Sequence, residues 1–65
     1  MTEYGKTVKK KLIDLDKSQA WLISEVKNET SLYLDSAYLS HILTGKRNAP
    51  KIKTIINNIL DIKEN

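Results

Sequence analysis

The most informative part of the sequence runs from Asp35 to Pro50 and reads DSAYLSHILTGKRNAP. Its apolar residues are spaced as on one face of an α-helix, which predicts a helix over 36–43. The inner face of that helix carries Leu39, Ile42 and Leu43. We therefore expect this segment to form a rod that stands out from the domain, with cations beside it.

Both ends of this predicted helix carry signals for a start and a stop. Asp35 or Ser36 can cap the start, because their side-chain oxygens accept hydrogen bonds from free backbone N–H groups. Gly45 ends the helix, because glycine adopts the left-handed backbone of a helix C-terminus at little steric cost. Residues 46–49 then form a loop, and Pro50 suits the first turn of a further helix.

Three further segments share the helical spacing of apolar residues. Ser18 is a good N-cap for a helix that begins at Gln19. The apolar run Ser31–Leu34 forms either an extended segment or an extra helical turn. The inner positions are Tyr4, Val8, Leu12 and Leu15 in a helix over 3–15, Leu22, Ile23 and Val26 in a helix from Gln19 to between Asn28 and Thr30, and Ile52, Ile55, Ile56, Ile59 and Leu60 in a helix after Pro50. The sequence therefore predicts an all-α fold, a small bundle of four to five helices, with residues 1–65 as a single domain.

Length and composition limit the class of protein. The chain has 65 residues, which is enough for one domain and too few for two. It has no cysteine, which fits a reducing compartment. The first residues are polar, and no apolar run approaches the roughly 20 residues that span a bilayer. We therefore expect a soluble protein of the cytoplasm with no membrane partner.

The charge is mildly positive and unevenly distributed. Eleven Lys and Arg residues against eight Asp and Glu residues give a net charge of +3. The basic residues gather in two clusters, which are Lys6, Lys9, Lys10 and Lys11 near the N-terminus and Lys46, Arg47, Lys51 and Lys53 after the predicted helix over 36–43. Two such clusters suit a polyanion, but two solvated helix faces would give the same pattern.

The sequence lacks the parts of common catalytic and cofactor sites. His41 is the only histidine and there is no cysteine, so neither a zinc site nor a Cys/His dyad can be assembled. Gly5 and Gly45 are isolated, so there is no glycine-rich phosphate loop. Asp14 and Asp16 are two positions apart and do not share a helix face. We therefore expect no catalytic residue, metal, cofactor or small-molecule substrate, and no enzyme.

Several short motifs stand at the predicted helix ends and along the helices. They are Ser18-Gln19 followed by Leu22, Tyr38-Leu39-Ser40 followed by Ile42, Gly45-Lys46-Arg47 followed by Pro50, and the opening Tyr4-Gly5-Lys6 with Val8 and Leu12. With these motifs the chain resembles the helix-turn-helix of the phage repressor and Cro family. Together these matches cover most of the chain. The resemblance implies a lambda-repressor-like helix-turn-helix with a lengthened turn segment.

Two features depart from the family pattern. The connection between the two helices of the motif is longer, and the added residues fall in 29–34. Ile23 stands where the family has a small alanine, at the close crossing of the two helices. Ser40 or Ala37 would lie opposite and compensate for the bulkier side chain.

The resemblance assigns DNA contacts to both helices of the motif. In such proteins the first residues of the second helix meet base edges in the major groove, while the first helix crosses the backbone. The resemblance implies base contacts by Ser36, Ala37 and His41, and backbone contacts by Gln19, Tyr38, Thr44, Lys46, Arg47, Asn48 and Lys51. The cations beyond the recognition helix would neutralise phosphates and release counterions.

Several of these residues also have an ordinary structural interpretation. His41 is either a base contact or an exposed histidine without one, and Ser36 can share the capping of its helix. Tyr38 either reaches a phosphate through its hydroxyl or packs against the preceding helix. Trp21 belongs either to the core or to a partner surface, and the lysines at 9–11 either form a solvated face or touch DNA.

The predicted function is sequence-specific regulation of transcription by a Cro-like repressor that occludes a promoter. The resemblance implies an operator in double-stranded DNA, a weak homodimer on half-sites about one helical turn apart, and a bacterial or phage-infected host cell. The candidate dimer surfaces are Ile59, Leu60 and Ile62, or Leu32, Tyr33 and Leu34. One alternative is an excisionase-like or architectural DNA binder. Another is a protein-binding antirepressor or antitoxin that docks its partner on Leu32, Tyr33 and Leu34.

Overall fold

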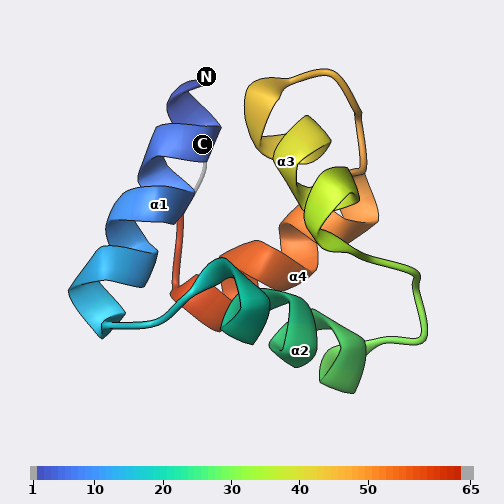
Figure 1. Cartoon of the computed structure of the whole chain (residues 1–65), viewed down its shortest axis with the longest axis horizontal. Coiled ribbons are helices and arrows are strands. Elements are labelled where there is room, and N and C mark those ends of the chain that lie inside the picture. The colour runs from blue at the N-terminus through green and yellow to red at the C-terminus, as the bar shows by residue number, and fades with distance from the viewer. Residues whose placement is uncertain (1, 64–65) are drawn as a thin grey trace.

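Four α-helices and no strand make up residues 2–63, the part of the chain that the computed structural model describes (Figure 1). The helices are α1 (Glu3–Leu15), α2 (Gln19–Glu29), α3 (Ser36–Thr44) and α4 (Pro50–Leu60). The predicted all-α bundle is confirmed, with four helices rather than five. None of these helices has the length and apolar character that a membrane crossing requires.

Capping interactions set the ends of the helices. Ser18 Oγ accepts a hydrogen bond from the backbone N–H three residues on, at 3.1 Å, and Asp35 Oδ1 accepts the equivalent bond at the start of α3, at 2.7 Å. Asp35, and not Ser36, is therefore the N-cap of α3. Gly45 ends α3 with φ 84°, and Pro50 opens α4, as the sequence predicts.

The apolar faces of the four helices meet in one core. The buried apolar side chains are Val8, Leu12, Leu22, Val26, Leu34, Leu39, Ile42, Leu43, Ala49, Ile52, Ile56 and Leu60. Most of the predicted inner positions are among them, and Tyr4, Ile23, Ile55 and Ile59 pack against this core while half-buried. Burial of each large aliphatic side chain stabilises the fold by roughly 1.5–3 kcal/mol.

The last three residues of α1 lie outside the core. The sequence predicts Leu15 on the inner face, and this prediction is wrong, because 47% of the side chain is exposed. The chain reverses directly after it through Asp16, whose backbone is left-handed with φ 57°. Ile13, in the same turn, is 77% exposed. Helical spacing places a residue on a face, but the neighbouring helix has to reach that far along to cover it.

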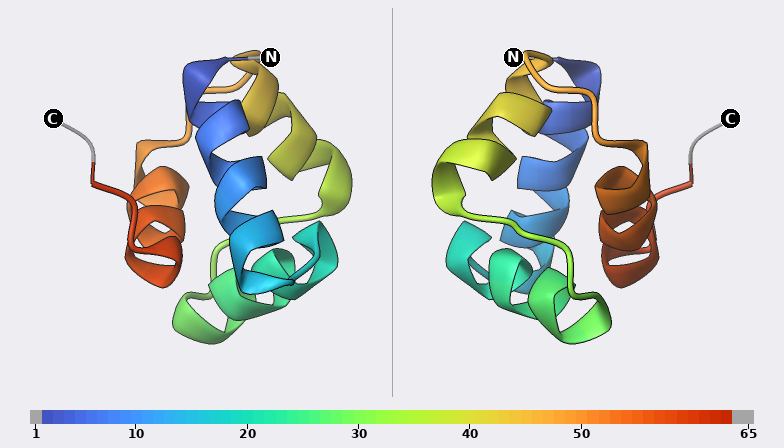
Figure 2. Two further views of the ribbon diagram at one scale, coloured as in Figure 1. Left: turned by 90° about the vertical axis from the view of Figure 1, so that its left-hand side faces the viewer. Right: turned by 90° about the vertical axis from the view of Figure 1, so that its right-hand side faces the viewer.

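The helices pack in two main pairs, α1 with α3 and α2 with α4. In the left-hand view of Figure 2, α1 lies in front, with α3 to one side and α4 to the other, and it contacts both helices. The Thr2 hydroxyl donates a 2.7 Å hydrogen bond to the Leu43 carbonyl and accepts one from the Gly5 N–H at 3.0 Å. The Tyr4 hydroxyl donates to Asn57 Oδ1 at 2.9 Å. These bonds fix the start of α1 to the end of α3 and to the middle of α4.

Residues 30–35 connect α2 to α3 without a helical turn, so the alternative of an extra helical turn is wrong. Leu34 is fully buried and anchors the connection in the core, whereas Leu32 and Tyr33 are exposed. The prediction that Leu34 belongs to a dimer or docking surface is therefore wrong. Leu60 is likewise buried, at 2% exposure, and cannot form part of such a surface.

Candidate nucleic-acid interface

One face of α3 is exposed along the length of the helix. Ala37, Ser40, His41 and Thr44 recur at i, i+3, i+4 and i+7, and all four are exposed. We call these four residues the outer face of α3. The opposite side of the helix carries its buried leucines and isoleucine. A groove-shaped ligand can therefore receive the outer face without disturbing the core.

Ser40 lies in the middle of this outer face and not in a helix crossing. The expectation that Ser40 or Ala37 packs opposite Ile23 is wrong, because both side chains are exposed. Ile23 is instead half-buried against the core. Ser40 is thus a candidate contact that sequence reasoning missed. Its spacing from Ala37 and Thr44 was the available signal, since residues three and four apart share a helix face.

The loop after α3 folds back over the end of the helix. The backbone N–H groups of Lys46 and Arg47 both donate to the His41 carbonyl, at 2.9 and 3.1 Å. The left-handed turn at Gly45 makes this geometry accessible. The side chains of Lys46, Arg47 and Asn48 are exposed, so the loop presents two cations and an amide directly beside the outer face of α3.

These cations are not neutralised by acidic side chains. Lys46, Arg47 and Lys51 are exposed, and neither the loop nor α4 contains an acidic residue. The one ion pair found in residues 2–63 joins Lys6 to Glu3 on the surface of α1, at 3.7 Å. The positive charge at the end of α3 is therefore available to a polyanion.

Tyr38 stands at the edge of the outer face and contacts two exposed side chains. Its ring centroid lies 5.2 Å from Arg47 Cζ, which is within the range of a cation–π interaction. It lies 6.4 Å from the ring centroid of Tyr33, with an angle of 49° between the ring planes. Tyr38 itself is half-buried and packs against the core. The sequence did not place Tyr33 beside α3, because only the fold of 30–35 brings it there.

Asp35 links Tyr33 to the start of α3. Its Oδ1 accepts the Tyr38 N–H, and its Oδ2 accepts the Tyr33 hydroxyl. The bond from Tyr33 is the main reason why the pKa of Asp35 lies below its ordinary value, and the bond from the Tyr38 N–H is the second. The bond to Asp35 in turn raises the pKa of Tyr33. At neutral pH the carboxylate therefore stays charged and holds both groups.

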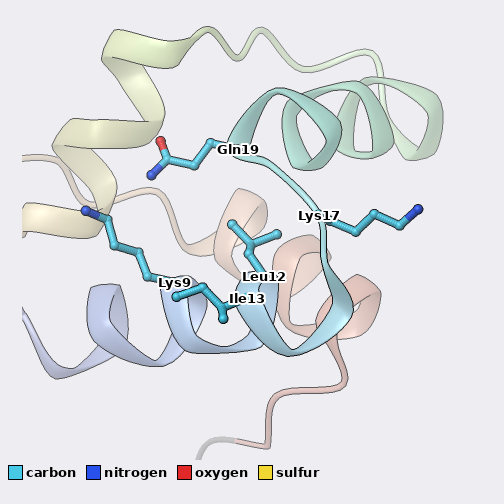
Figure 3. Close-up of a pocket in the computed structure, with 5 residues that line it drawn as sticks. All are labelled: Lys9, Leu12, Ile13, Lys17 and Gln19. Atoms are coloured by element: carbon cyan, nitrogen blue, oxygen red, sulfur yellow. The ribbon is translucent and has the colours of Figure 1, made fainter.

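Gln19, the first residue of α2, lines an open depression of about 300 Å³ together with Lys9, Leu12, Ile13 and Lys17. Figure 3 shows the amide of Gln19 and the amine of Lys9 pointing to the same side, whereas Lys17 points away. Gln19 is half-buried at a helix N-terminus, where the dipole and free N–H groups favour an anion.

The predicted contact residues thus gather on α3, on the loop after it and at the starts of α2 and α4. The exposed ones are Ser36, Ala37, His41, Thr44, Lys46, Arg47, Asn48 and Lys51, and the half-buried ones are Gln19 and Tyr38. Thr44 already donates its hydroxyl proton to the Ser40 carbonyl at 3.0 Å. It would have to give up that bond in order to donate to a phosphate.

Neither a metal-binding cluster nor a relative assigns a function to this site. Within residues 2–63, no group of three or more His, Cys, Asp or Glu side chains is placed to hold a metal ion. Comparison of the chain with family models, with curated proteins and with solved structures yields no match. The geometry and charge around α3 are therefore the basis of any functional proposal.

Proposed function

We propose that this chain is a sequence-specific DNA-binding regulator of transcription, in which α2 and α3 act as the helix-turn-helix of a Cro-like repressor. The observation that carries the proposal is the outer face of α3, exposed next to cations for which residues 2–63 supply no acidic partner. On this proposal the protein acts by occupying a promoter and not by catalysis.

The chemistry of the outer face of α3 suits the major groove. An α-helix fits that groove, where each base pair presents a distinct pattern of donors, acceptors and methyl groups. Ala37 would contact a thymine methyl, and the hydroxyl of Ser40 would donate to or accept from a base edge. His41 would accept from or donate to a purine. Ser36, exposed in the first turn, would contact the neighbouring base pair.

The surrounding groups suit the phosphate backbone. Lys46, Arg47 and Lys51 would bind phosphates on one side of the groove, with Asn48 as a neutral donor. Gln19 would bind a phosphate at the N-terminus of α2, where the helix dipole adds to the attraction. Each neutralised phosphate releases counterions, so binding would weaken steeply as salt rises.

We further propose a weak homodimer on DNA, with half-sites about 34–36 Å apart. Since Leu34 and Leu60 are buried, the apolar residues left for its interface are Ile59 with Ile62, or Leu32 with Tyr33.

Selection of bound duplexes from a random pool, followed by gel shifts at two salt concentrations, tests the proposal. Arg47→Ala is expected to weaken binding to all sequences alike and to reduce the salt slope by about one. His41→Ala is expected to change the preference at one base position. Lys63→Ala is the matched control, because Lys63 is an exposed cation in the segment after α4, and Figure 2 shows this segment on the side away from α3.

Three outcomes would contradict the proposal at different points. The absence of any shift at low salt would overturn DNA binding and favour a protein partner, as for an antirepressor or antitoxin. Equal affinity for all duplexes would indicate an architectural binder. The same uniform loss for His41→Ala as for Arg47→Ala would overturn the assigned base contact.

A further inference from the structure

Tyr33 is held in one orientation although most of its side chain faces solvent. The side chain is 66% exposed, yet its hydroxyl donates to Asp35 and its ring contacts Tyr38. The next residue, Leu34, is fully buried and fixes the backbone. An exposed aromatic ring that is already ordered loses little conformational entropy when it binds a partner.

The position of Tyr33 extends the proposed interface beyond α3. Tyr38 contacts Tyr33 through its ring and also lies under the Arg47 guanidinium. Tyr38 precedes His41 by three residues, so it flanks the outer face of α3 on the His41 side. We call Tyr33, Tyr38 and Arg47 the aromatic edge. A duplex that receives the outer face would pass along this edge.

The chemistry of Tyr33 limits what its ring can recognise. Its hydroxyl already donates to the Asp35 carboxylate, and that negative charge disfavours a nearby phosphate. The part of the ring that does not face Tyr38 remains exposed for contact. In DNA this part of the ring fits an apolar group at the wall of the groove, either a thymine methyl or a deoxyribose.

We propose that Tyr33 is a further DNA-contacting residue, which packs its ring on a thymine methyl or a deoxyribose just beyond the bases that α3 covers. Arg47, at the other contact of Tyr38, binds the adjoining phosphate. The added segment between α2 and α3 thereby extends the DNA contact beyond the bases that α3 covers. This inference rests on the proposed function, since it takes DNA to be the ligand.

Gel shifts on the selected duplex with Tyr33→Ala, Tyr33→Phe and Ser31→Ala test the inference. Tyr33→Ala is expected to weaken binding about fivefold, the lower end of what the stacking of an aromatic side chain on a base contributes. Tyr33→Phe keeps the ring but loses the hydrogen bond to Asp35 that orders it, so this variant is expected to lose less binding than Tyr33→Ala. Ser31→Ala changes an exposed residue of the same connection that has no part in the proposed interfaces, and it is the matched control. Thermal unfolding of each variant establishes that the binding reactions contain folded protein.

Replacing each thymine at the edges of the duplex by deoxyuridine, one at a time, removes the methyl groups singly. This experiment distinguishes a thymine methyl from a deoxyribose as the group that the Tyr33 ring contacts. If the ring packs on a methyl, one replacement weakens the unsubstituted protein and leaves Tyr33→Ala unchanged. If it packs on a deoxyribose, no replacement matters and Tyr33→Ala loses the same factor on every flanking sequence. Either result supports the inference.

Other results overturn it. Unchanged binding of Tyr33→Ala, alongside weakened binding of Arg47→Ala, removes Tyr33 from the interface and leaves the proposed function standing. An equal loss in Tyr33→Phe and Tyr33→Ala shows that the hydroxyl and not the ring is responsible. A loss confined to the band with two protein copies assigns Tyr33 to a dimer contact. If the unsubstituted protein binds no DNA, both proposals fail together.

Discussion

At the scale of single residues, the carboxylate of Asp35 accepts two hydrogen bonds that stabilise different parts of the structure. One oxygen caps α3 and the other accepts the hydroxyl of Tyr33. Both bonds favour the charged form, and they hold the pKa of Asp35 below its ordinary value of 3.8. The N-terminus of α3 therefore depends on the negative charge of Asp35, which strong acid removes by protonating the carboxylate.

Asp35→Ala is expected to lower the unfolding temperature at neutral pH, and the difference from the unsubstituted protein is expected to shrink in acid. Because the pKa is lower in the folded than in the unfolded chain, the stabilisation is complete above the ordinary pKa of 3.8. It is lost as the pH falls through the lowered value. Thermal unfolding followed by circular dichroism, from neutral pH to below that value, measures the difference.

Ser18→Ala is the control for this pH dependence. Ser18 caps α2 through a hydroxyl that does not titrate in this range. Its removal is expected to destabilise the protein by about 1 kcal/mol, by the same amount at each pH. A constant difference for Asp35→Ala as well would contradict the role of its charge.

At the scale of elements, the helices could be predicted from the sequence because their signals are local. Ser18, Asp35, Gly45 and Pro50 mark starts and stops through their own side chains or backbone preferences, and the structure uses all four in that way. The apolar spacing of α3 likewise predicted which side of it is buried, and so which side is open to a partner.

The connection between α2 and α3 could not be predicted in the same way. A short apolar run such as 31–34 has no period that distinguishes strand from helix or buried from exposed. Leu34 enters the core, while Tyr33 beside it reaches Tyr38, because α2 and α3 are already placed by their own packing. The same dependence on neighbours exposes Leu15, which lies on the expected face of α1 but is not covered by another helix.

The turn from α3 into its loop gives a prediction at this scale. Gly45→Ala is expected to destabilise the protein by about 1–2 kcal/mol, because a residue with a Cβ is strained in a left-handed conformation. The new Cβ would also lie 2.9 Å from the methyl of Thr2. That methyl cannot rotate away without breaking the hydrogen bonds of its hydroxyl with Leu43 and Gly5.

Thr2→Ser keeps that hydroxyl and removes the methyl, so it separates the two causes. Urea unfolding of the two single variants and the double variant is expected to show that Thr2→Ser recovers part of the loss caused by Gly45→Ala. Strict additivity of the two substitutions would rule out the steric contribution and leave backbone strain alone.

At the scale of the whole molecule, a single small core holds every element. A domain of this size buries only about 60% of the surface that its unfolded chain exposes, so few contacts are dispensable. The connection to α3 contributes to that core through Leu34. Residues 29–34 are an addition relative to the phage repressor and Cro pattern. Through Leu34 they nevertheless help to keep the protein folded.

Leu34→Ala is expected to cost about 2–5 kcal/mol of stability, through lost apolar burial and the cavity left behind. That is a large share of the roughly 5–15 kcal/mol that native proteins have. Leu32→Ala, two positions earlier and exposed, is expected to change stability by about 0.5 kcal/mol or less. Chemical denaturation measures both. If both variants lost equally little stability, residues 30–35 would lie on the surface and would not contribute to the core.

The bond between Thr2 and Leu43 has a consequence for how the chain is made. Its two partners are 41 positions apart, and a ribosome adds roughly 5–20 residues per second. An isolated helix of fewer than about 12–15 residues is marginal in water, so α1, with 13 residues, gains its main packing partner only when α3 has emerged. For some seconds the nascent N-terminal segment would stay largely uncoiled, with Val8 and Leu12 open to chaperones, until the segment that follows Asp35 arrives to cover them.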